Sequence, residues 1–304
     1  MAPEAHIPVL LDEVVTVLDP RPGETYVDAT AGLGGHASEI ARRLGEGTVV
    51  LADLDTSNLE RAEARVREAA PGVVVHAVHA NFAQVPWWMA DQGLRADMVL
   101  ADLGFASTQV DDPARGFSFR EDGPLDMRLD PTSGVPASDL VNDLDERSLA
   151  DLLFRFGEER LSRRIARKVV EVREDEPIRT TRHLARIVQA AYPRGSHRIH
   201  PATRTFQALR IAVNDELGSL DALLERIGPV REGGWLQADA RVAIIAFHSL
   251  EDRPVKRRFA HLEEQDLAVR LTKKPIRASD EECRHNPRAR SARLRAVRLQ
   301  GFKD

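Results

Sequence analysis

The sequence predicts an α/β fold in which a mostly parallel sheet with an antiparallel last strand is interrupted by an inserted all-helical domain. Short apolar runs that end in aspartate alternate with helical periodicity, which is typical of parallel strands joined through helices. The segment between Asp102 and Arg241, which separates two of these runs, is far longer than one crossover helix requires. It is itself helical in pattern, so we expect it to hold a domain of its own.

Five apolar runs are expected to form the parallel strands because each is bounded by turn or helix signals. They are Thr25–Asp28, Thr48–Asp53, Val73–Val78, Asp97–Asp102 and Arg241–Phe247. The glycine-rich turn Ala31–His36 follows the first strand and leads into a helix with Ile40 and Leu44 on one face. A second helix is expected over Asn58–Ala70.

The inserted domain is expected over residues 113–203, which leaves 1–112 and 204–304 for the sheet domain. Prolines punctuate its helical patterns and mark their boundaries. The predicted helices of this arginine-rich segment are Ser148–Phe156, Glu159–Arg173 and Thr181–Ala191.

After residue 204 the chain is expected to return to the sheet and close it. Thr205–Ile227 predicts one returning helix, and Val269–Arg277 with Ala292–Leu299 predicts a closing pair of strands. This part of the chain is also basic, since Arg253–Asp304 holds 15 Lys and Arg against 7 Asp and Glu while the whole chain has a net charge of −5. Such a tail attracts phosphates, but an ordinary solvated surface would carry the same charge.

Composition excludes several classes of protein. Apolar residues make up 42% of the 304 residues, enough for a buried core, yet the longest apolar run, Val242–Phe247, is far below the roughly 18 residues of a membrane span. The N-terminus lacks the layout of a secretory signal. The single cysteine, Cys283, cannot form an internal disulfide, so we expect a cytoplasmic protein that does not contact a membrane.

The turn after the first strand carries the clearest chemical signal. Gly32 and Gly34 allow a tight strand-to-helix turn and bring backbone N–H groups close to a ligand, and Ala37 completes the G-x-G-x-x-A pattern of dinucleotide-binding enzymes. However, Asp28 places a carboxylate at the end of the strand, which would repel a pyrophosphate and attract an ammonium or sulfonium group. The spacing D-x-x-x-G-x-G is also typical of S-adenosylmethionine-dependent methyltransferases.

Three further residues stand at or after the ends of predicted strands. Asp53 ends the second strand, where a carboxylate can accept hydrogen bonds from ribose hydroxyls, and Phe82 follows the third, where a ring can pack on adenine. Asp102 ends the fourth strand. Any one of these aspartates could simply cap a helix or begin a turn. Ligands bind outside the carboxyl ends of parallel strands, so the ordered set favours a binding crevice there.

Longer motifs then make a family recognisable. The chain resembles the bacterial 16S ribosomal RNA (cytosine-N4)-methyltransferases, which methylate a decoding-region cytidine with S-adenosylmethionine. The matching stretches occur in the order of that family and span nearly the whole chain. They are His6–Glu13, Asp28–His36, Asp102–Asp111, Arg115–Phe119, Asp122–Asp130, His200–Leu217 and Phe247–Arg253.

The resemblance implies a Rossmann-like methyltransferase sheet with a helical substrate-recognition domain inserted after the fourth strand. It also implies S-adenosylmethionine as cofactor, and as partner 16S rRNA within the small ribosomal subunit or its precursor. Carried over by position, the cofactor contacts are Gly34, Gly35, His36, Asp53, Phe82, Asp102 and Gln109. Charge and turn geometry add Asp28 and Gly32 to that set.

The N4 amino group of cytosine is a weak nucleophile, because its lone pair is delocalised into the ring. We therefore expect the enzyme to supply a group that makes this lone pair more available. Many amino-methyltransferases carry D/N-P-P-Y at the end of the fourth strand, whereas this chain has Asp102-Leu-Gly with no proline pair. We therefore take Asp102 and His248 as candidate catalytic residues. The candidate substrate-binding residues are Asp126, Asp130, Arg204, Ser249 and Arg253. Arg204 and Arg210 could instead pair with Asp215 or Glu216 on the returning helix.

Other functions remain as alternatives. The glycine pattern alone would suit an NAD(P)-dependent oxidoreductase, and a methyltransferase fold could serve as a non-catalytic RNA-binding protein in ribosome assembly. A metal site is not expected, because Cys283 with His285 is too sparse for zinc, which takes four ligands. No serine lies in the context of a hydrolase nucleophile elbow. The sequence leaves a homodimer open.

Overall fold

The computed structural model describes residues 7–104, 107–193, 195, 199–228 and 234–301. His6, the first residue of the N-terminal motif, lies outside these ranges. The chain forms two compact units, one of residues 1–104 with 217–304 and one of residues 105–216. Throughout the described ranges, no helix has both the length and the apolarity that crossing a membrane requires.

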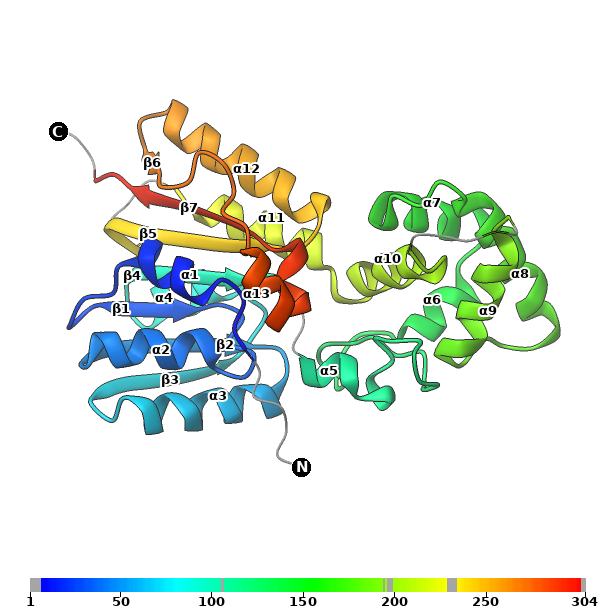
Figure 1. Ribbon diagram of the computed structural model, residues 1–304, viewed down its shortest axis with the longest axis horizontal. Coiled ribbons are helices and arrows are strands. Elements are labelled where there is room, and N and C mark those ends of the chain that lie inside the picture. The colour runs from blue at the N-terminus through cyan, green and yellow to red at the C-terminus, as the bar shows by residue number, and fades with distance from the viewer. Residues whose placement is uncertain (1–6, 105–106, 194, 196–198, 229–233, 302–304) are drawn as a thin grey trace. The chain divides into compact units, whose positions relative to one another are not determined.

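The first unit, called the sheet unit below, is built on seven strands in the order β3-β2-β1-β4-β5-β7-β6 (Figure 1). The strands are β1 Thr25–Asp28, β2 Gly47–Asp53, β3 Val73–His79, β4 Ala96–Asp102, β5 Leu236–Ala246, β6 Ala268–Arg270 and β7 Arg293–Leu299. β1 to β5 are mutually parallel, and β7 runs antiparallel to both of its neighbours. The predicted mostly parallel sheet with an antiparallel last strand is confirmed.

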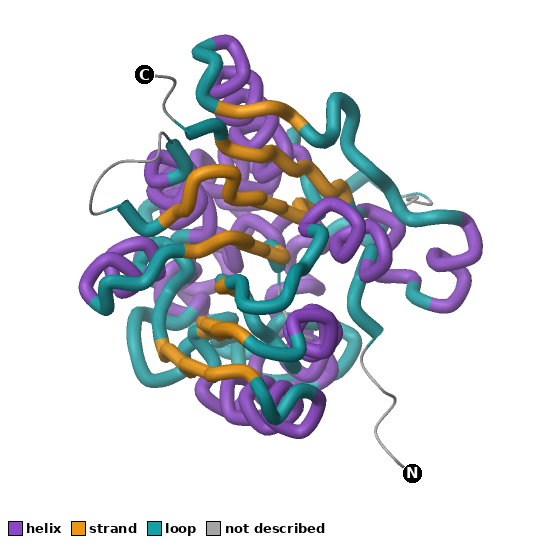
Figure 2. Tube along the Cα trace, turned by 90° about the vertical axis from the view of Figure 1, so that its left-hand side faces the viewer, coloured by secondary structure: helices purple, strands orange, loops and turns teal. Residues whose placement is uncertain are grey.

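Helices cover both faces of this sheet (Figure 2). They are α1 Leu11–Leu18, α2 Gly35–Leu44, α3 Thr56–Ala69, α4 Val85–Asp91, α11 Glu216–Arg226, α12 Ser249–Glu264 and α13 Asp280–His285, followed by the short 3-10 helix η2 Pro287–Ser291. Successive strand residues point to opposite faces, so Tyr26 joins one apolar core with Ile40 while Val27 joins the other with Phe259. The sheet is therefore the middle layer of three.

Two predicted strands differ from the structure by more than one residue at an end. β5 begins at Leu236, five residues before the predicted start. The predicted strand Val269–Arg277 is wrong in extent, since β6 ends at Arg270. Thr272 interrupts the ladder because its Oγ1 accepts the hydrogen bond of the Ala296 N–H, and Pro275 has no N–H to donate.

The second unit, called the helical unit below, confirms the predicted all-helical insertion. Its elements are α5 Ser107–Asp111, the 3-10 helix η1 Pro113–Arg115, α6 Ala137–Asp143, α7 Glu146–Gly157, α8 Ser162–Asp175, α9 Thr181–Ala191 and α10 Ala202–Asn214. A separate apolar core, including Leu153, Ile165, Leu184 and Phe206, lies between these helices. Arginine-rich outer faces and apolar inner faces explain why the helices assemble around it.

The expected single helix Thr205–Ile227 is wrong, because the chain breaks at Asp215, which takes a left-handed φ of 45°. The first half, α10, buries Phe206 and Leu209 in the helical core and packs closely on Gly157 of α7. The compact helical unit therefore spans 105–216, beyond the predicted 113–203 at both ends. Helical periodicity alone does not show which core an apolar face joins.

Candidate functional site

The loop after β1 is held between the ends of the two neighbouring strands. Ala29 N–H donates to the Leu100 carbonyl of β4, and Ala31 N–H donates to the Ala52 carbonyl of β2. Gly32 and Gly34 then take left-handed φ angles of 51° and 72°, and α2 begins at the next residue. The glycines thus make the predicted tight turn at the carboxyl edge of the sheet.

The three glycines of this loop differ in how much room a side chain would have at each position. A Cβ on Gly34 would lie 2.7 Å from Cα of Ala62 in α3, and one on Gly35 would lie 2.5 Å from Cγ of Pro8. Gly32 would meet nothing nearer than the Thr30 carbonyl at 3.9 Å. Gly34 and Gly35 are therefore required by packing inside the protein, a reason that the sequence did not indicate, whereas a Cβ on Gly32 would have room.

Asp53 links the end of β2 to this loop. Its Oδ2 accepts from the Gly32 N–H at 2.8 Å and its Oδ1 accepts from the Asp55 N–H at 2.8 Å. Burial raises the pKa of the Asp53 carboxyl to about 6, although these hydrogen bonds oppose the shift. Each oxygen keeps a second lone pair, so Asp53 can hold the loop and still accept from a ligand hydroxyl.

Asp28 is more enclosed than its position in the sequence suggests. Only 2% of it is exposed, and it accepts hydrogen bonds from the Tyr26 hydroxyl at 3.0 Å and the Thr30 N–H at 3.3 Å. Burial raises the pKa of the Asp28 carboxyl to about 7. The raised pKa favours the uncharged form of the Asp28 carboxyl. Tyr26, two residues earlier on the same strand face, is the signal that the sequence analysis missed.

Replacing Asp28 with asparagine is expected to stabilise the protein increasingly as the pH rises from 5 to 8. The folded state binds the Asp28 proton more tightly than the unfolded chain, whose pKa is near 3.8, so this group's contribution to stability falls as pH rises from about 4 through 7. Asparagine has no such proton. At pH 8, Asp28→Asn is therefore expected to raise the free energy of unfolding by about 2–4 kcal/mol over wild type.

The measurement is thermal or denaturant unfolding of both proteins across that pH range. Asp145→Asn serves as the control, because hydrogen bonds from Ser148 lower the pKa of Asp145 and its removal should give no gain that grows with pH. A difference between Asp28→Asn and wild type that does not change with pH would contradict the prediction.

Asp102 ends β4 beside this loop, and one of its carboxylate oxygens is available to accept a hydrogen bond. Its backbone N–H donates to Thr30 Oγ1 at 2.7 Å, and its Oδ2 lies 3.9 Å from His36 Nδ1. Its buried Oδ1 has no hydrogen-bond partner among the described residues. Burial, together with the nearby charges of Asp28 and Glu251, raises the pKa of the Asp102 carboxyl well above its usual range.

His36 connects the loop to the N-terminal segment. Its ring is 7% exposed, and its Nε2 lies 2.8 Å from the Val9 carbonyl. The same segment is held from the other side, where Glu282 accepts from the Leu10 N–H at 2.7 Å and Asn286 donates to the Ile7 carbonyl at 3.0 Å. The position of His36 thus depends on contacts from both ends of the chain.

The loops after β3 and β5 supply the other predicted residues of this unit. Phe82 is half-buried against the core that contains α4 and α11, and its neighbour Asn81 donates to Ser219 Oγ at 2.9 Å. His248 precedes α12, and its Nε2 lies 3.1 Å from Oε1 of the buried Glu251. Glu251 Oε2 in turn accepts from the Phe247 N–H at 2.8 Å, so this turn is rigidly held.

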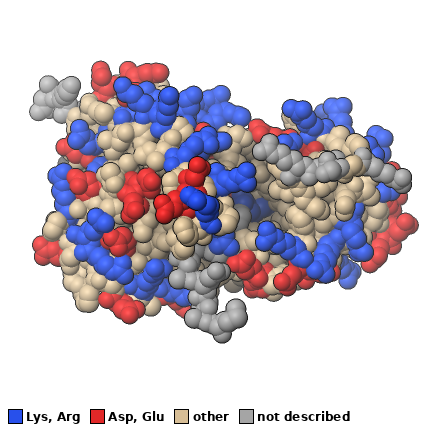
Figure 3. All heavy atoms as spheres, in the orientation of Figure 1, with Lys and Arg blue, Asp and Glu red and all other residues tan. Residues whose placement is uncertain are grey.

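Helix α12 presents positive charge to solvent. Ser249, its first residue, is half-buried, whereas Arg253, Lys256 and Arg257 are exposed. Lys and Arg gather over α12 along the upper edge of Figure 3. Arg258 differs, because it turns inward and donates to the Ile227 carbonyl.

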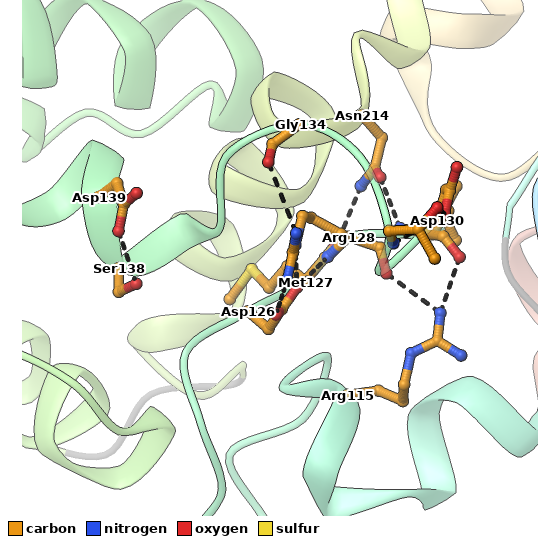
Figure 4. A network of polar contacts seen from close by, with 11 residues as sticks. Arg115, Asp126, Met127, Arg128, Asp130, Gly134, Ser138, Asp139 and Asn214 are labelled. Carbon is orange, nitrogen blue, oxygen red and sulfur yellow. Dashed lines mark hydrogen bonds and ion pairs between the residues drawn. The ribbon is translucent and has the colours of Figure 1, made fainter.

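The remaining predicted residues belong to the helical unit, and most are engaged within it. Gln109, on α5, is 3% exposed. Asp126 forms a two-pronged ion pair with Arg128, whose hydrogen bonds outweigh burial and lower the pKa of Asp126 (Figure 4). Asp130 accepts from the Thr132 and Ser133 hydroxyls.

Two arginines of α10 behave differently. Arg210 pairs with Glu216 through contacts of 2.7 and 2.8 Å, which is the pairing that the sequence left open. Arg204 is exposed and donates one bond to the Glu158 carbonyl at 3.2 Å. The guanidinium of Arg204 therefore keeps donors for a ligand.

Comparison with known proteins identifies the family of this chain. The family model described as the MraW methylase family matches residues 4–300. The chain belongs to that family. A ribosomal RNA small subunit methyltransferase H from Solibacter usitatus is 47% identical over 296 residues, covering 97% of this chain and 100% of the relative. The protein of the same name from Deinococcus radiodurans is 48% identical and covers 96% and 88%.

The solved structures that were compared have low sequence identity and low structural similarity to this chain. A putative rRNA methylase from Clostridium thermocellum aligns over 97% of this chain and 100% of its own, with 10% identity and a TM-score of 0.42. That likeness is too low to support an inference. Family membership confirms the resemblance read from the sequence motifs, and the methylase class does not favour the oxidoreductase and non-catalytic alternatives.

Proposed function

We propose that this methylase transfers the methyl group of S-adenosylmethionine to the N4 amino group of a decoding-region cytidine in 16S rRNA, within the cytoplasmic small ribosomal subunit or its precursor. The observation that carries the proposal is Asp102, whose buried Oδ1 has no partner among the described residues and lies at the carboxyl edge of the sheet. The relatives' names as small-subunit rRNA methyltransferases support the same substrate.

The residues around the β1 loop fit a cationic nucleoside. A Cβ on Gly32 would meet no atom nearer than 3.9 Å, and Asp53, which holds the Gly32 N–H from the end of the neighbouring strand, retains acceptor capacity for ribose hydroxyls. Burial raises the pKa values of Asp28 and Asp102, and a bound ammonium or sulfonium would lower those pKa values and favour the charged carboxylates that attract it. Gly34, Gly35 and His36 shape the loop, and Phe82 is the remaining member of the proposed cofactor set on the sheet unit.

The chemistry consists mainly of positioning and of releasing a lone pair. When bound, S-adenosylmethionine supplies a methyl group that is activated by its sulfonium for in-line transfer. Asp102 Oδ1 accepts a hydrogen bond from the N4 amino group, which draws the lone pair toward the nitrogen. The new N–C bond would form as the S–C bond of the methyl donor breaks, and the Asp102 carboxylate would take the proton that N4 must then lose. The sulfonium of a bound cofactor would lower the raised pKa of Asp102 and favour the carboxylate that this role requires.

Residues that hold the RNA are proposed on both units. On the sheet unit, the half-buried residues His248 and Ser249 follow the end of β5, and Arg253 offers an exposed cation one turn further along α12. On the helical unit, Arg204 is the exposed candidate, whereas Asp126 and Asp130 act by fixing the loop in which they lie. Phosphate contacts orient RNA, and splayed bases are read individually.

Replacing Asp53 with alanine is expected to weaken S-adenosylmethionine binding about 10- to 100-fold. The change removes an acceptor for the ribose and also releases the Gly32 N–H that Asp53 now holds. Titration calorimetry measures the effect. The control is Asp55→Ala, which removes the cap of α3 but leaves the strand-end carboxylate, so its affinity should stay within about threefold of wild type. Equal losses in both variants would contradict the role of Asp53.

The function itself is tested by transfer of a radiolabelled methyl group to small ribosomal subunits that lack the modification. We expect label in 16S rRNA, with mass spectrometry placing it on N4 of one cytidine. S-adenosylhomocysteine, and not NAD, should raise the melting temperature. Absence of label from rRNA under conditions where S-adenosylmethionine binds would overturn the proposed substrate.

A further inference from the structure

A stack of three aromatic rings runs from the core of the helical unit to its surface. Phe206 is 5% exposed in the core, and the Phe119 ring meets it edge-on with centroids 4.8 Å apart. His200 then lies over Phe119, with centroids 4.6 Å apart and planes inclined by 32°. His200 itself is exposed, so the stack ends in an aromatic ring that borders solvent.

The outer ring is held in place. The Ala202 N–H donates to His200 Nδ1 at 3.2 Å, which requires that this nitrogen carry no proton. The neutral ring therefore bears its hydrogen on Nε2 and offers one donor to a ligand. A ring fixed by a hydrogen bond and backed by Phe119 loses little conformational freedom when a flat group stacks on it.

Positive charge lies beside the stack. Arg120 follows Phe119 in the chain, and Arg182 Nη2 donates to the Arg120 carbonyl at 2.8 Å; both arginines are exposed. Of the acids on the same loop, Asp122 is engaged by the Arg182 N–H, and Glu121 is exposed. Ile199, next to His200, is 59% exposed and offers an apolar border.

We propose that Phe119, His200, Arg120 and Arg182 form a base-stacking platform for an unstacked nucleobase of the RNA substrate. Aromatic rings that take the face of a base, flanked by arginines that take the phosphates, are the recurrent means of holding single-stranded RNA. The proposal rests on the proposed function for the identity of the RNA. It concerns binding, and the transfer chemistry at Asp102 is separate from it.

The experiment measures binding of a short fluorescein-labelled single-stranded RNA by anisotropy, without methyl transfer. His200→Ala is expected to weaken binding about five- to a hundredfold, the range found for loss of one stacked base. His200→Phe keeps a ring and should stay within about twofold of wild type. Arg120→Gln and Arg182→Gln should each weaken binding and reduce the salt dependence by about one counterion.

An RNA of the same length with abasic sites separates stacking from a structural effect. Wild type and His200→Ala should bind this probe equally, since it has no base to stack. An equal loss on both probes, or a loss in His200→Phe as large as in His200→Ala, would overturn the platform. If methyl transfer to rRNA fails while the ring-dependent binding persists, the proposed function fails and the platform stands.

Discussion

Replacement of Asp102 by alanine is expected to lower kcat for methyl transfer about 100- to 10,000-fold. Its Oδ1, which has no hydrogen-bond partner in the described part of the chain, is the acceptor proposed to free the N4 lone pair, and no water can take over that fixed position without losing orientation. Stability should not fall, because the pKa of Asp102 is raised by burial and by two neighbouring carboxylates, so its charge opposes folding. We thus expect Asp102→Ala to lower kcat without lowering the free energy of unfolding.

The measurement is single-turnover transfer to small subunits at saturating S-adenosylmethionine, with thermal unfolding of the same samples. Asp97→Ala is the matched control, since Asp97 lies at the opposite end of β4 and accepts from the Thr25 N–H. It should lose stability and keep kcat. His248→Ala in the same assay tests the second catalytic candidate. An Asp102→Ala enzyme within about threefold of wild-type kcat would exclude Asp102 as the acceptor.

A single added methyl group at Gly34 is expected to destabilise the protein by about 2–5 kcal/mol. The new Cβ would lie 2.7 Å from the backbone of Ala62, and an L-residue would also have to adopt a φ of 72°. Since α2 and α3 pack at this contact, relief requires moving the cofactor loop away from α3. We therefore expect S-adenosylmethionine affinity to fall together with the melting temperature.

Gly45→Ala is the matched control for this change. Gly45 has a similar φ of 66°, but a Cβ there meets no described atom within 4 Å. Gly45→Ala therefore measures the backbone strain of a positive φ without a steric clash like that with Ala62. It should lower the free energy of unfolding by about 1–2 kcal/mol. Gly32→Ala, with a φ of 51° and no near contact, should resemble Gly45 in stability. If Gly34→Ala and Gly45→Ala lose equal stability, the contact with Ala62 contributes nothing.

Local patterns determined much of the sheet unit. β1 has the predicted bounds, and β2, β3 and β4 differ by one residue, because buried apolar runs bounded by aspartate or glycine leave little choice of structure. The sequence also placed Asp53 and Asp102 at one edge of the sheet, since carboxyl ends of parallel strands meet there, and the two residues end the strands that flank β1. The motifs then indicated the family, which comparison confirmed.

Tertiary structure decided what each of these residues touches. The protonation of Asp28 depends on its burial beside Tyr26, and the need for glycine at position 34 depends on Ala62 of another helix. Helix α10 belongs to the helical unit because Phe206 is buried there, and the break at Asp215 separates it from α11. Periodicity along the chain fixes which side of an element is apolar, whereas the partner of that side is set by packing between residues far apart in sequence.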